Sequence, residues 1–332
     1  MDIRIFDGQL RLTGICDRIL SLTVREEFAG EGFCTLRVPL SEGEKFSVDN
    51  ILRFPGAEEE YVIRAVERDS ASGICRVDGS GLLSLFGRRI LREPVTASGA
   101  AEEILCTLAE QWGPAVLPGS LRTERTGISA EISAATGHDS LLTAMKRICV
   151  SAGVGMTLRL DADGREFVFS VRSRRETSRI LSRSAGTLQG LTEKRDFTRY
   201  RSRAVVIGVG DRTAVVEAAG LFDDGVDDGA MPVREIFEDA SDLALGRFDG
   251  EDAYQAALQA RGKQILAQHR PICTLTAETA EESARLLQVG DVCYVSDETL
   301  GIMSPTLCTA RTLSGDGALP TYAVTVQVLE TE

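Results

Sequence analysis

The chain has 332 residues, a formal net charge of −13 and 43% hydrophobic residues. This length exceeds one typical domain, so two or three packed units are expected. The negative charge argues against sequence-specific nucleic-acid binding, because a grip on phosphate needs clustered cations. The 32 glycines and 5% aromatic residues favour turn-rich β structure.

The N-terminal sequence predicts a first strand rather than a targeting signal. Residues 1–7 alternate polar and apolar side chains and lack the apolar run of a signal peptide. No window approaches eighteen unbroken apolar residues, so we expect no membrane span. We therefore expect the chain to fold in a cytoplasm.

Residues 1–91 predict one all-β unit. Turn signals such as Asp7-Gly8 and Pro55-Gly56 separate its strand-like segments at the spacing of a small barrel or sandwich. The expected strands are residues 3–6, 10–13, 19–26, 34–39, 51–54, 61–68 and 74–78. Ser72-Gly73 can supply the tight turn of a hairpin between the last two segments.

A short amphipathic run follows this hairpin over residues 79–90. Its helical spacing places Leu82, Leu85 and Phe86 on one face. The run closes on the basic doublet Arg88 and Arg89. We predict that these two arginines belong to an interface with another protein.

Residues 92–184 predict a small α+β module. Ser98 is the expected N-cap of a first helix that ends at Gly113-Pro114. A second helix is expected to begin near Asp139 or Ser140. Two strands over residues 155–160 and 166–171 then surround a turn, which makes a hairpin.

Residues 185–332 predict a return to β structure, with a helix near residues 253–268. The expected strands are residues 188–194, 203–208, 211–218, 272–277, 291–296, 306–312 and 322–329. No internal repeat is found by residue identity. Two β units on either side of an α+β insert are nevertheless a repeated shape.

The eight cysteines and two histidines do not predict a metal site. The cysteines are scattered singly without a CxxC pair, and His138 lies far from His269. Most of the cysteines have apolar neighbours, which favours reduced thiols in a core. We expect no metal and no cofactor.

Two acidic segments could bind a cation, but a simpler structure explains each. Residues 161–164 resemble a fragment of a calcium loop without its further ligands, which favours a hairpin turn. Residues 223–229 carry four carboxylates in seven positions, so either a divalent ion or water must relieve their repulsion. We favour a hydrated loop.

The remaining candidates for chemistry also favour structural roles. His138, Asp139 and Ser140 are neighbours at a helix start, and sequence neighbours do not make a catalytic triad. The run 58–60 and the pair 281–282 are carboxylates in polar surroundings, where raised pKa values are not expected. The glycines of 208–211 lack a following helix for phosphate binding. The arginines between residues 172 and 183 have no interleaved aromatics, which favours a solvated or protein-facing surface. We predict no catalytic residue.

The order of these elements resembles the tail-hub family of tailed phages and prophage-derived particles, which includes the N-terminal hub region of tail-associated lysins. The run from Gly79 to Ile90, GSGLLSLFGRRI, is similar to the family signature V-x-G-x-S-L-x-x-L-L-x-x-R. Residues 203–208, RAVVIG, stand where members carry N-V-V-x-V-x-G. Residues 287–292, LQVGDV, are similar to L-G-D-x-V. The chain departs from the family at Arg203-Ala204, which replace the usual Asn, and in the acidic loop.

The resemblance implies an α+β, mainly β fold with three domains. Residues 1–91 and 185–332 correspond to two β-barrel-like domains of the tail-tube type. Residues 92–184 correspond to an α+β insert with two helices and a hairpin. The chain stops soon after its last strand, so we expect a hub without a lysin.

The resemblance also implies a structural function in a virion or phage-tail-like particle, at the tail tip or baseplate, after assembly in the bacterial cytoplasm. A homotrimer would present six β units to a hexameric tail tube or distal tail protein. A tape-measure protein and tail-tip spike or receptor-binding proteins are further expected partners. An acidic bore would let a genome pass without capture.

Two other classes of function stay open from the residues alone. A β-rich adhesion or binding module is one, although the single Trp and five Tyr offer few platforms for sugar stacking. A hydrolase that uses Asp or Glu is the other. Loss of turnover on mutation of His138 or Asp139 would indicate the hydrolase.

Overall fold

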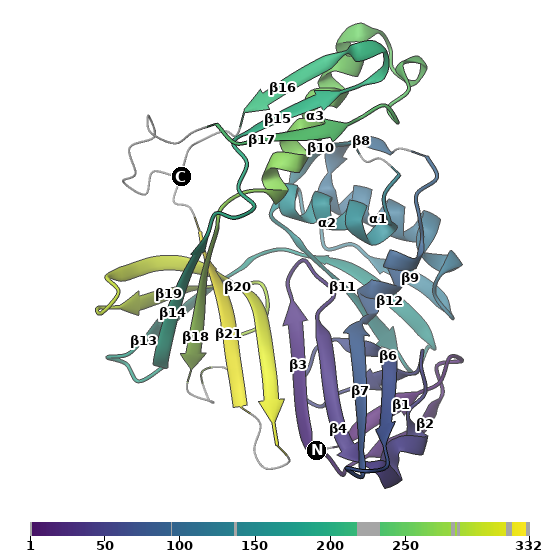
Figure 1. Ribbon diagram of the computed structural model, residues 1–332, viewed down its shortest axis with the longest axis vertical. Helices are drawn as coiled ribbons and strands as arrows, with labels where there is room; N and C mark the ends of the chain where they lie inside the picture. The colour runs from purple at the N-terminus through teal and green to yellow at the C-terminus, as the bar shows by residue number, and fades with distance from the viewer. Residues whose placement is uncertain are drawn as a thin grey trace.

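The computed structural model describes residues 2–93, 95–135, 138–217, 233–279, 283, 286–316 and 321–329. Within them, thirteen strands form one large sheet, and three smaller sheets accompany it. Figure 1 shows two β units side by side, with helices and small sheets above the unit that contains the N-terminus. The chain therefore has the α+β, mainly β fold that the sequence predicted.

The N-terminal β unit has the strand order β3-β4-β7-β6-β5-β1-β2. Its strands are β1 (Ile3–Phe6), β2 (Leu12–Cys16), β3 (Ser21–Glu27), β4 (Phe33–Pro39), β5 (Ile51–Arg53), β6 (Glu60–Asp69) and β7 (Ile74–Gly81). In β3 and β4 every second side chain is buried, as alternation predicts for a sheet with one covered face. Leu36, Phe46, Tyr61 and Val77 lie in the resulting core.

The amphipathic run after the hairpin of β6 and β7 forms a 3₁₀ helix over Leu82–Arg88. Leu82, Leu83, Leu85 and Phe86 are buried in it and join the core of the insert. This short helix therefore fastens the N-terminal β unit to the helical layer.

The insert contains two helices, α1 (Ala101–Trp112) and α2 (Leu141–Ala152). Its strands are β8 (Thr96–Ala100), β9 (Ser120–Glu124), β10 (Glu131–Ala135), β11 (Gly155–Asp161) and β12 (Glu166–Arg172). β8 pairs with β10, and β11-β12-β9 form a second small sheet. The β11–β12 hairpin was predicted, whereas β9 and β10 were not.

The two helix starts differ in how well the sequence predicted them. Ser140 caps α2, because its hydroxyl accepts a hydrogen bond from the Thr143 N–H at 3.1 Å. Ser98 does not cap α1: it lies in β8, where its hydroxyl is 2.9 Å from that of Ser133. The residue before α1 is Ala100, which has no capping side chain. Because β8 pairs with β10 as far as Ala100, α1 begins at Ala101, two residues later than an N-cap at Ser98 would place it.

A third layer consists of one helix and three strands. These are α3 (Glu251–Gln268) and the sheet β16-β15-β17, formed by β15 (Arg203–Ile207), β16 (Thr213–Glu217) and β17 (Glu235–Asp239). Gly262 allows α3 to approach this sheet, because a Cβ there would lie 2.5 Å from Val216 Cγ2. α3 also contacts α2 and β10 of the insert.

The C-terminal β unit has the order β14-β18-β21-β20-β19-β13. Its strands are β13 (Arg175–Ser182), β14 (Leu188–Asp196), β18 (Ile272–Thr279), β19 (Asp291–Asp297), β20 (Ile302–Gly315) and β21 (Thr321–Val328). Leu275, Cys308, Val324 and Val326 lie in its core. The predicted domain division at residues 91/92 and 184/185 stays a prediction.

None of the helices in the described ranges is both long enough and apolar enough to cross a membrane.

Candidate assembly interface

The two β units are joined edge to edge by β3 and β20. The strands are antiparallel, with Ala310 opposite Glu27 at one end of the ladder and Gly315 opposite Leu22 at the other. Figure 1 shows this junction at the middle of the molecule. Because backbone hydrogen bonds cross it, the two units form one continuous sheet.

A buried ion pair lies in the junction. Arg311 Nη2 is 2.6 Å from Glu26 Oε2, and the two side chains are 7% and 5% exposed. The Arg311 guanidinium also donates to the Gly56 carbonyl at 2.9 Å and to the Leu287 carbonyl at 3.4 Å. Glu26 accepts a further hydrogen bond from the Glu58 N–H. The pair thus ties the two strands to a loop in each β unit.

The charges of this pair stabilise each other. Burial disfavours the charged guanidinium of Arg311, but the Glu26 carboxylate outweighs that effect and raises the pKa of Arg311. Arg311 is therefore positively charged in the folded chain. Removing either partner would leave an uncompensated charge in the interior.

The acidic run beside the junction corrects one expectation from the sequence. Glu59 and Glu60 were expected in polar surroundings with ordinary pKa values, but both are buried. Burial raises the pKa of Glu59 to about 8, against the opposing charge of Arg172 and with help from nearby carboxylates. Burial also raises the pKa of Glu60, which is held by Arg53 at 2.8 Å and by the Leu160 N–H at 3.0 Å.

Arg175 of β13, and Arg183 directly after that strand, form ion pairs with β19. Arg175 Nε is 2.7 Å from Asp291 Oδ1, and Arg183 Nε is 2.7 Å from Asp297 Oδ2. Both aspartate side chains are almost fully buried, whereas both arginines are about half exposed. The hydrogen bond from Arg183 lowers the pKa of Asp297. These arginines thus compensate buried carboxylates of the sheet.

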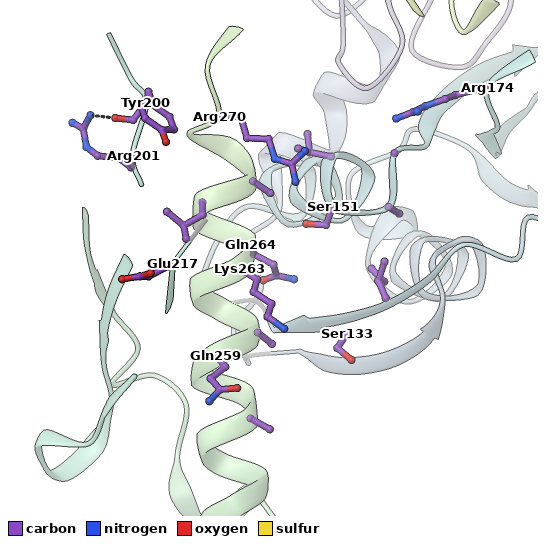
Figure 2. A pocket seen from close by; sticks show the side chains of 18 residues that line it. Ser133, Ser151, Arg174, Tyr200, Arg201, Glu217, Gln259, Lys263, Gln264 and Arg270 are labelled. Atoms are coloured by element: carbon purple, nitrogen blue, oxygen red, sulfur yellow. Dashed lines mark hydrogen bonds between the residues drawn. The ribbon is translucent and has the colours of Figure 1, made fainter. Parts of the chain in front are cut away.

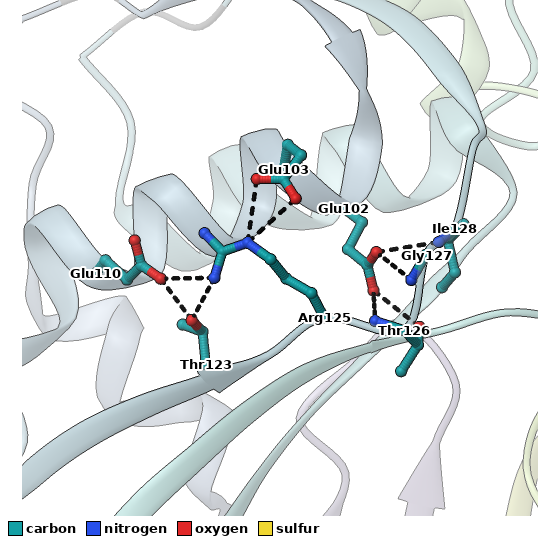
Figure 3. Close-up of polar contacts among 8 residues, drawn as sticks. All are labelled: Glu102, Glu103, Glu110, Thr123, Arg125, Thr126, Gly127 and Ile128. Carbon is teal, nitrogen blue, oxygen red and sulfur yellow. Dashed lines mark hydrogen bonds and ion pairs between the residues drawn. The ribbon is translucent and has the colours of Figure 1, made fainter.

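Glu102 on α1 fixes the chain that follows β9 (Figure 3). Its carboxylate accepts hydrogen bonds from the N–H groups of Thr126, Gly127 and Ile128 and from the Thr126 hydroxyl, at 2.6–3.0 Å. Burial alone would raise the pKa of Glu102, but these hydrogen bonds outweigh it and lower the pKa. Arg125 adds an exposed ion pair with Glu103 of the same helix at 3.1 Å.

A cavity of about 870 Å³ lies between α3, α2 and β10. Figure 2 shows Lys263 of α3, and Arg270 just after the end of that helix, on the side where Ser133 and Ser151 lie. Arg174 and Arg201 also line the cavity, together with one carboxylate, that of Glu217. Its lining is therefore basic although the chain as a whole is acidic.

The sequence matches a protein-family model over residues 2–309, and that family is described as Siphovirus ReqiPepy6 Gp37-like protein. The match covers most of the chain. The chain belongs to this Gp37-like family.

Solved tail proteins share the fold of the Gp37-like chain. Prophage tail protein gp18 from Listeria monocytogenes EGD-e is 14% identical with a TM-score of 0.57, over 100% of this chain and 96% of that one. The tail protein from Neisseria meningitidis MC58 is 14% identical with a TM-score of 0.58, over 98% and 96%. The 43 kDa tail protein of prophage MuSo2 from Shewanella oneidensis is 12% identical with a TM-score of 0.59, over 98% of both chains. No curated protein matches the chain.

Family and fold together confirm the resemblance to phage tail-hub proteins. The chain is Gp37-like by family, and its fold is that of solved prophage tail proteins.

The predicted interface residues Arg88 and Arg89 lie at the end of the 3₁₀ helix of the Gp37-like chain. Arg88 is exposed and pairs with Asp49. The Arg89 guanidinium lies 5.1 Å from the centre of the Trp112 ring, a cation–π distance. Their role in an interface stays a prediction.

The other candidates from the sequence lie apart from the junction. Asp139 pairs with Arg147, and Ser140 caps α2, while His138 is exposed. Asp161 accepts hydrogen bonds from the next turn of chain, as a hairpin turn requires. The acidic segment 223–229 and the pair 281–282 lie outside the described residues.

The cysteines of the Gp37-like chain are core residues where the structure describes their side chains. Those of residues 16, 34, 75, 106, 149, 293 and 308 are buried and free. Burial raises the pKa of Cys16 and Cys106 to about 11 and that of Cys149 to about 12. Over the described residues, no group of three His, Cys, Asp or Glu side chains could hold a metal ion.

Sequence reasoning missed the Glu26–Arg311 pair, although β3 carried a signal. Leu22, Val24 and Glu26 occupy successive inward positions of this strand. A carboxylate on an otherwise apolar face requires a partner when it is buried. The alternation of β3 therefore predicts a cation opposite Glu26, but not which one.

Proposed function

We propose that this Gp37-like chain is a structural hub of the tail. Three copies form a ring that caps a hexameric tail tube and adapts it to the tail tip. The observation that carries the proposal is the β3–β20 junction, because it joins two β units of matching strand order in one chain. Three chains then supply six similar units, which is the number that a sixfold tube offers.

The partners follow from this matching of symmetry. The hexameric tail tube, or a distal tail protein, binds one side of the ring. A tape-measure protein and tail-tip spike or receptor-binding proteins are the other neighbours. Permanent assemblies of this kind bury more than about 2,000 Å² per interface.

The role is structural rather than enzymatic. The acidic and basic groups considered for chemistry stabilise the fold: Glu26 pairs with Arg311, Asp139 with Arg147 and Glu60 with Arg53. The described thiols are buried and keep their protons, because burial raises their pKa values. Neither feature supports a nucleophile or a general base in a cleft.

The net charge of −13 fits a passage for an acidic polymer. A bore with the same sign of charge as phosphate repels a genome and lets it slide. A basic bore in the assembled ring would contradict this part of the proposal.

The test is the mass and symmetry of the purified chain. Size-exclusion chromatography with light scattering should give about 107 kDa, three times the 35.8 kDa of one chain. Class averages from electron microscopy should show a threefold ring with six peripheral lobes. A monomer or dimer at all concentrations, or particles without a central opening, would overturn the proposal.

A further inference from the structure

The two β units repeat the same arrangement of strands. Across the sheet, β3-β4-β7-β6-β5-β1 of the first unit matches β14-β18-β21-β20-β19-β13 of the second. The matched strands also follow one another in the same order along the chain. Each strand therefore has a counterpart, with β14 corresponding to β3 and β20 to β6. The units differ at their last strands, since β1 is antiparallel to β5 whereas β13 is parallel to β19.

The correspondence extends to single residues, because both units carry a bulge in the matching strand. The register of β6 against β7 shifts between Ile63 and Ala65. That of β20 against β21 shifts between Cys308 and Ala310. Bulges fix the register of a strand, so Ala65 corresponds to Ala310.

The ladders carry this register to the other edge of each unit. Val66 lies in a row with Val77, Leu36 and Leu22. Its counterpart Arg311 lies in a row with Val324, Ala277 and Leu191. Leu191 of β14 therefore corresponds to Leu22 of β3.

Only one of the two possible junctions is formed inside the chain. β3 pairs with β20, but their counterparts β14 and β6 are separated by six intervening strands of the sheet. Among the described strands, β14 pairs with β18 alone. Residues 65–69 of β6 pair with β7 alone, because β5 reaches only to Val62. Among the described strands, each chain thus leaves two edges open for pairing: that of β14, the counterpart of β3, and that of residues 65–69 of β6, the counterpart of β20.

We propose that β14 of one copy pairs with residues 65–69 of β6 in a second copy and repeats the β3–β20 junction between chains. The contact is antiparallel. Inside the chain, Arg25 lies opposite Thr312. Their counterparts are Lys194 and Glu67, so these two residues lie opposite each other in the contact between chains. Val24 lies opposite Leu313, which transfers to Glu193 opposite Arg68.

The transferred register brings opposite charges together twice. Within the chain, Lys194 and Glu193 of β14 already pair with Asp196 and Arg195 of the same strand, and Arg68 donates to the Gly43 carbonyl, so the contact between chains adds to these interactions. The register was fixed by bulges and backbone ladders alone, so the charges are an independent observation. Lys194 is 71% exposed and Glu67 is also exposed, so both can reach across an edge. Directly opposed unlike charges stabilise a strand pair, whereas like charges destabilise it. Charged edge strands also protect sheets from unwanted pairing, but that protection does not require unlike charges in one register.

The pairing is head to tail, since each copy offers a β14 edge to one neighbour and a β6 edge to the other. Such contacts generate a ring when the rotation closes. The inference rests on the proposed hub ring and names the surface that closes it. The partner is a second copy of this chain, because the chain already forms the corresponding contact internally, between β3 and β20.

A charge exchange tests the ion pairs. Glu67→Lys and Lys194→Glu should each weaken assembly roughly 3- to 30-fold, because an attractive pair becomes a repulsive one. The double variant E67K/K194E should recover most of the loss, since the pair is restored with its signs reversed. Exposed Glu103, on α1 away from both edges, supplies the control Glu103→Lys, which should assemble as the parent does. Equal assembly of all four variants would overturn the pairing.

Cysteine cross-linking tests the register itself. Glu67→Cys with Lys194→Cys should give disulfide-linked multimers on mild oxidation, because directly opposite Cβ atoms lie about 4.5–5.5 Å apart. Glu67→Cys with Thr192→Cys is the matched control, shifted by two residues on the same strand face, and should cross-link far less. The parent chain controls for its own thiols.

The outcomes separate the pairing from the proposed function. A trimer that cross-links equally or not at all in both variants overturns the pairing and leaves the hub. A closed assembly of another size that cross-links only at Glu67 and Lys194 supports the pairing and overturns the trimer. A chain that stays monomeric and unlinked at about 100 µM overturns both.

Discussion

Arg311 and Glu26 are 285 residues apart in the sequence and form the ion pair at the centre of the sheet. The pair is buried, and its hydrogen bonds reach a loop in each β unit. Its position means that the N-terminal and C-terminal β units are stabilised together.

Replacing Arg311 should therefore lower the denaturant concentration at which both units unfold. Arg311→Met leaves the Glu26 carboxylate buried without a counter-charge, which should cost about 3–5 kcal/mol of unfolding free energy. Urea unfolding followed by circular dichroism measures this. Arg203→Ala is the control, because its partners Glu217 and Glu235 are exposed, and it should cost less than about 1 kcal/mol. The double variant R311M/E26L should lose less than the sum of its single changes. Additive losses would contradict a coupled pair.

The contribution of Glu102 to the free energy of unfolding should depend on pH. Glu102→Ala removes the acceptor of four hydrogen bonds and should cost about 2–4 kcal/mol at pH 7. Because folding lowers the pKa of Glu102, this stabilisation is present above the pKa of the unfolded chain and disappears as the pH falls through the folded pKa. The gap between parent and variant should narrow from pH 7 to pH 3. Fluorescence of Trp112, the single tryptophan, can follow the unfolding. Exposed Glu103→Ala should show no such gap.

Glu59 should make the chain less stable as the pH rises. The folded pKa of about 8 lies above the ordinary value of 4.5, so between these values the unfolded chain has released a proton that the folded chain keeps. The unfolding free energy should fall by about 1.4 kcal/mol per pH unit in this window. Glu59→Gln should remove that slope and be more stable than the parent at pH 8. Unfolding curves at pH 5.5, 6.5, 7.5 and 8.5 compare the two chains. Parallel curves would show that Glu59 is ionised in the folded state.

The thiols should be protected from reagents in the folded chain. Seven of the eight cysteines are buried in the described structure, so a thiol reagent at pH 8 should modify at most one thiol quickly. All eight should react in denaturant. Rapid modification of two or more thiols in the folded chain would place a cysteine at the surface.

The two serines at the expected helix starts should behave differently. Ser140→Ala removes the N-cap of α2 and should cost about 1 kcal/mol. Ser98→Ala should stay within about 0.5 kcal/mol, because Ser98 lies in β8 and caps no helix. Equal losses would mean that Ser98 also caps α1.

The comparison of these serines illustrates what the sequence could predict. Local patterns identified the hairpin of β6 and β7, whose turn contains Gly73 at φ 67°, and the end of α2 at Gly153 at φ 66°. Both depend on residues within a few positions of one another. Sheet partners far apart in the sequence carry no such signal, so the pairing of β13 with β19 and of β3 with β20 was not foreseen.

The candidate site was predicted less well than the fold. The interface role of Arg88 and Arg89 stays a prediction, whereas Glu26 and Arg311 at the β3–β20 junction were not singled out from the sequence. The run 58–60 looked solvated because it is polar, yet tertiary packing buries Glu59 beside the ion pair. Burial of charge is decided by partners that the local sequence does not reveal.

The β3–β20 junction has a consequence for synthesis of the chain. β3 is complete at residue 27, but its neighbour ends at residue 315. A ribosome adds about 5–20 residues per second, so the edge of β3 waits about 15–60 s for its strand. The nascent N-terminal unit must therefore remain soluble with the edge of β3 open until β20 has been synthesised.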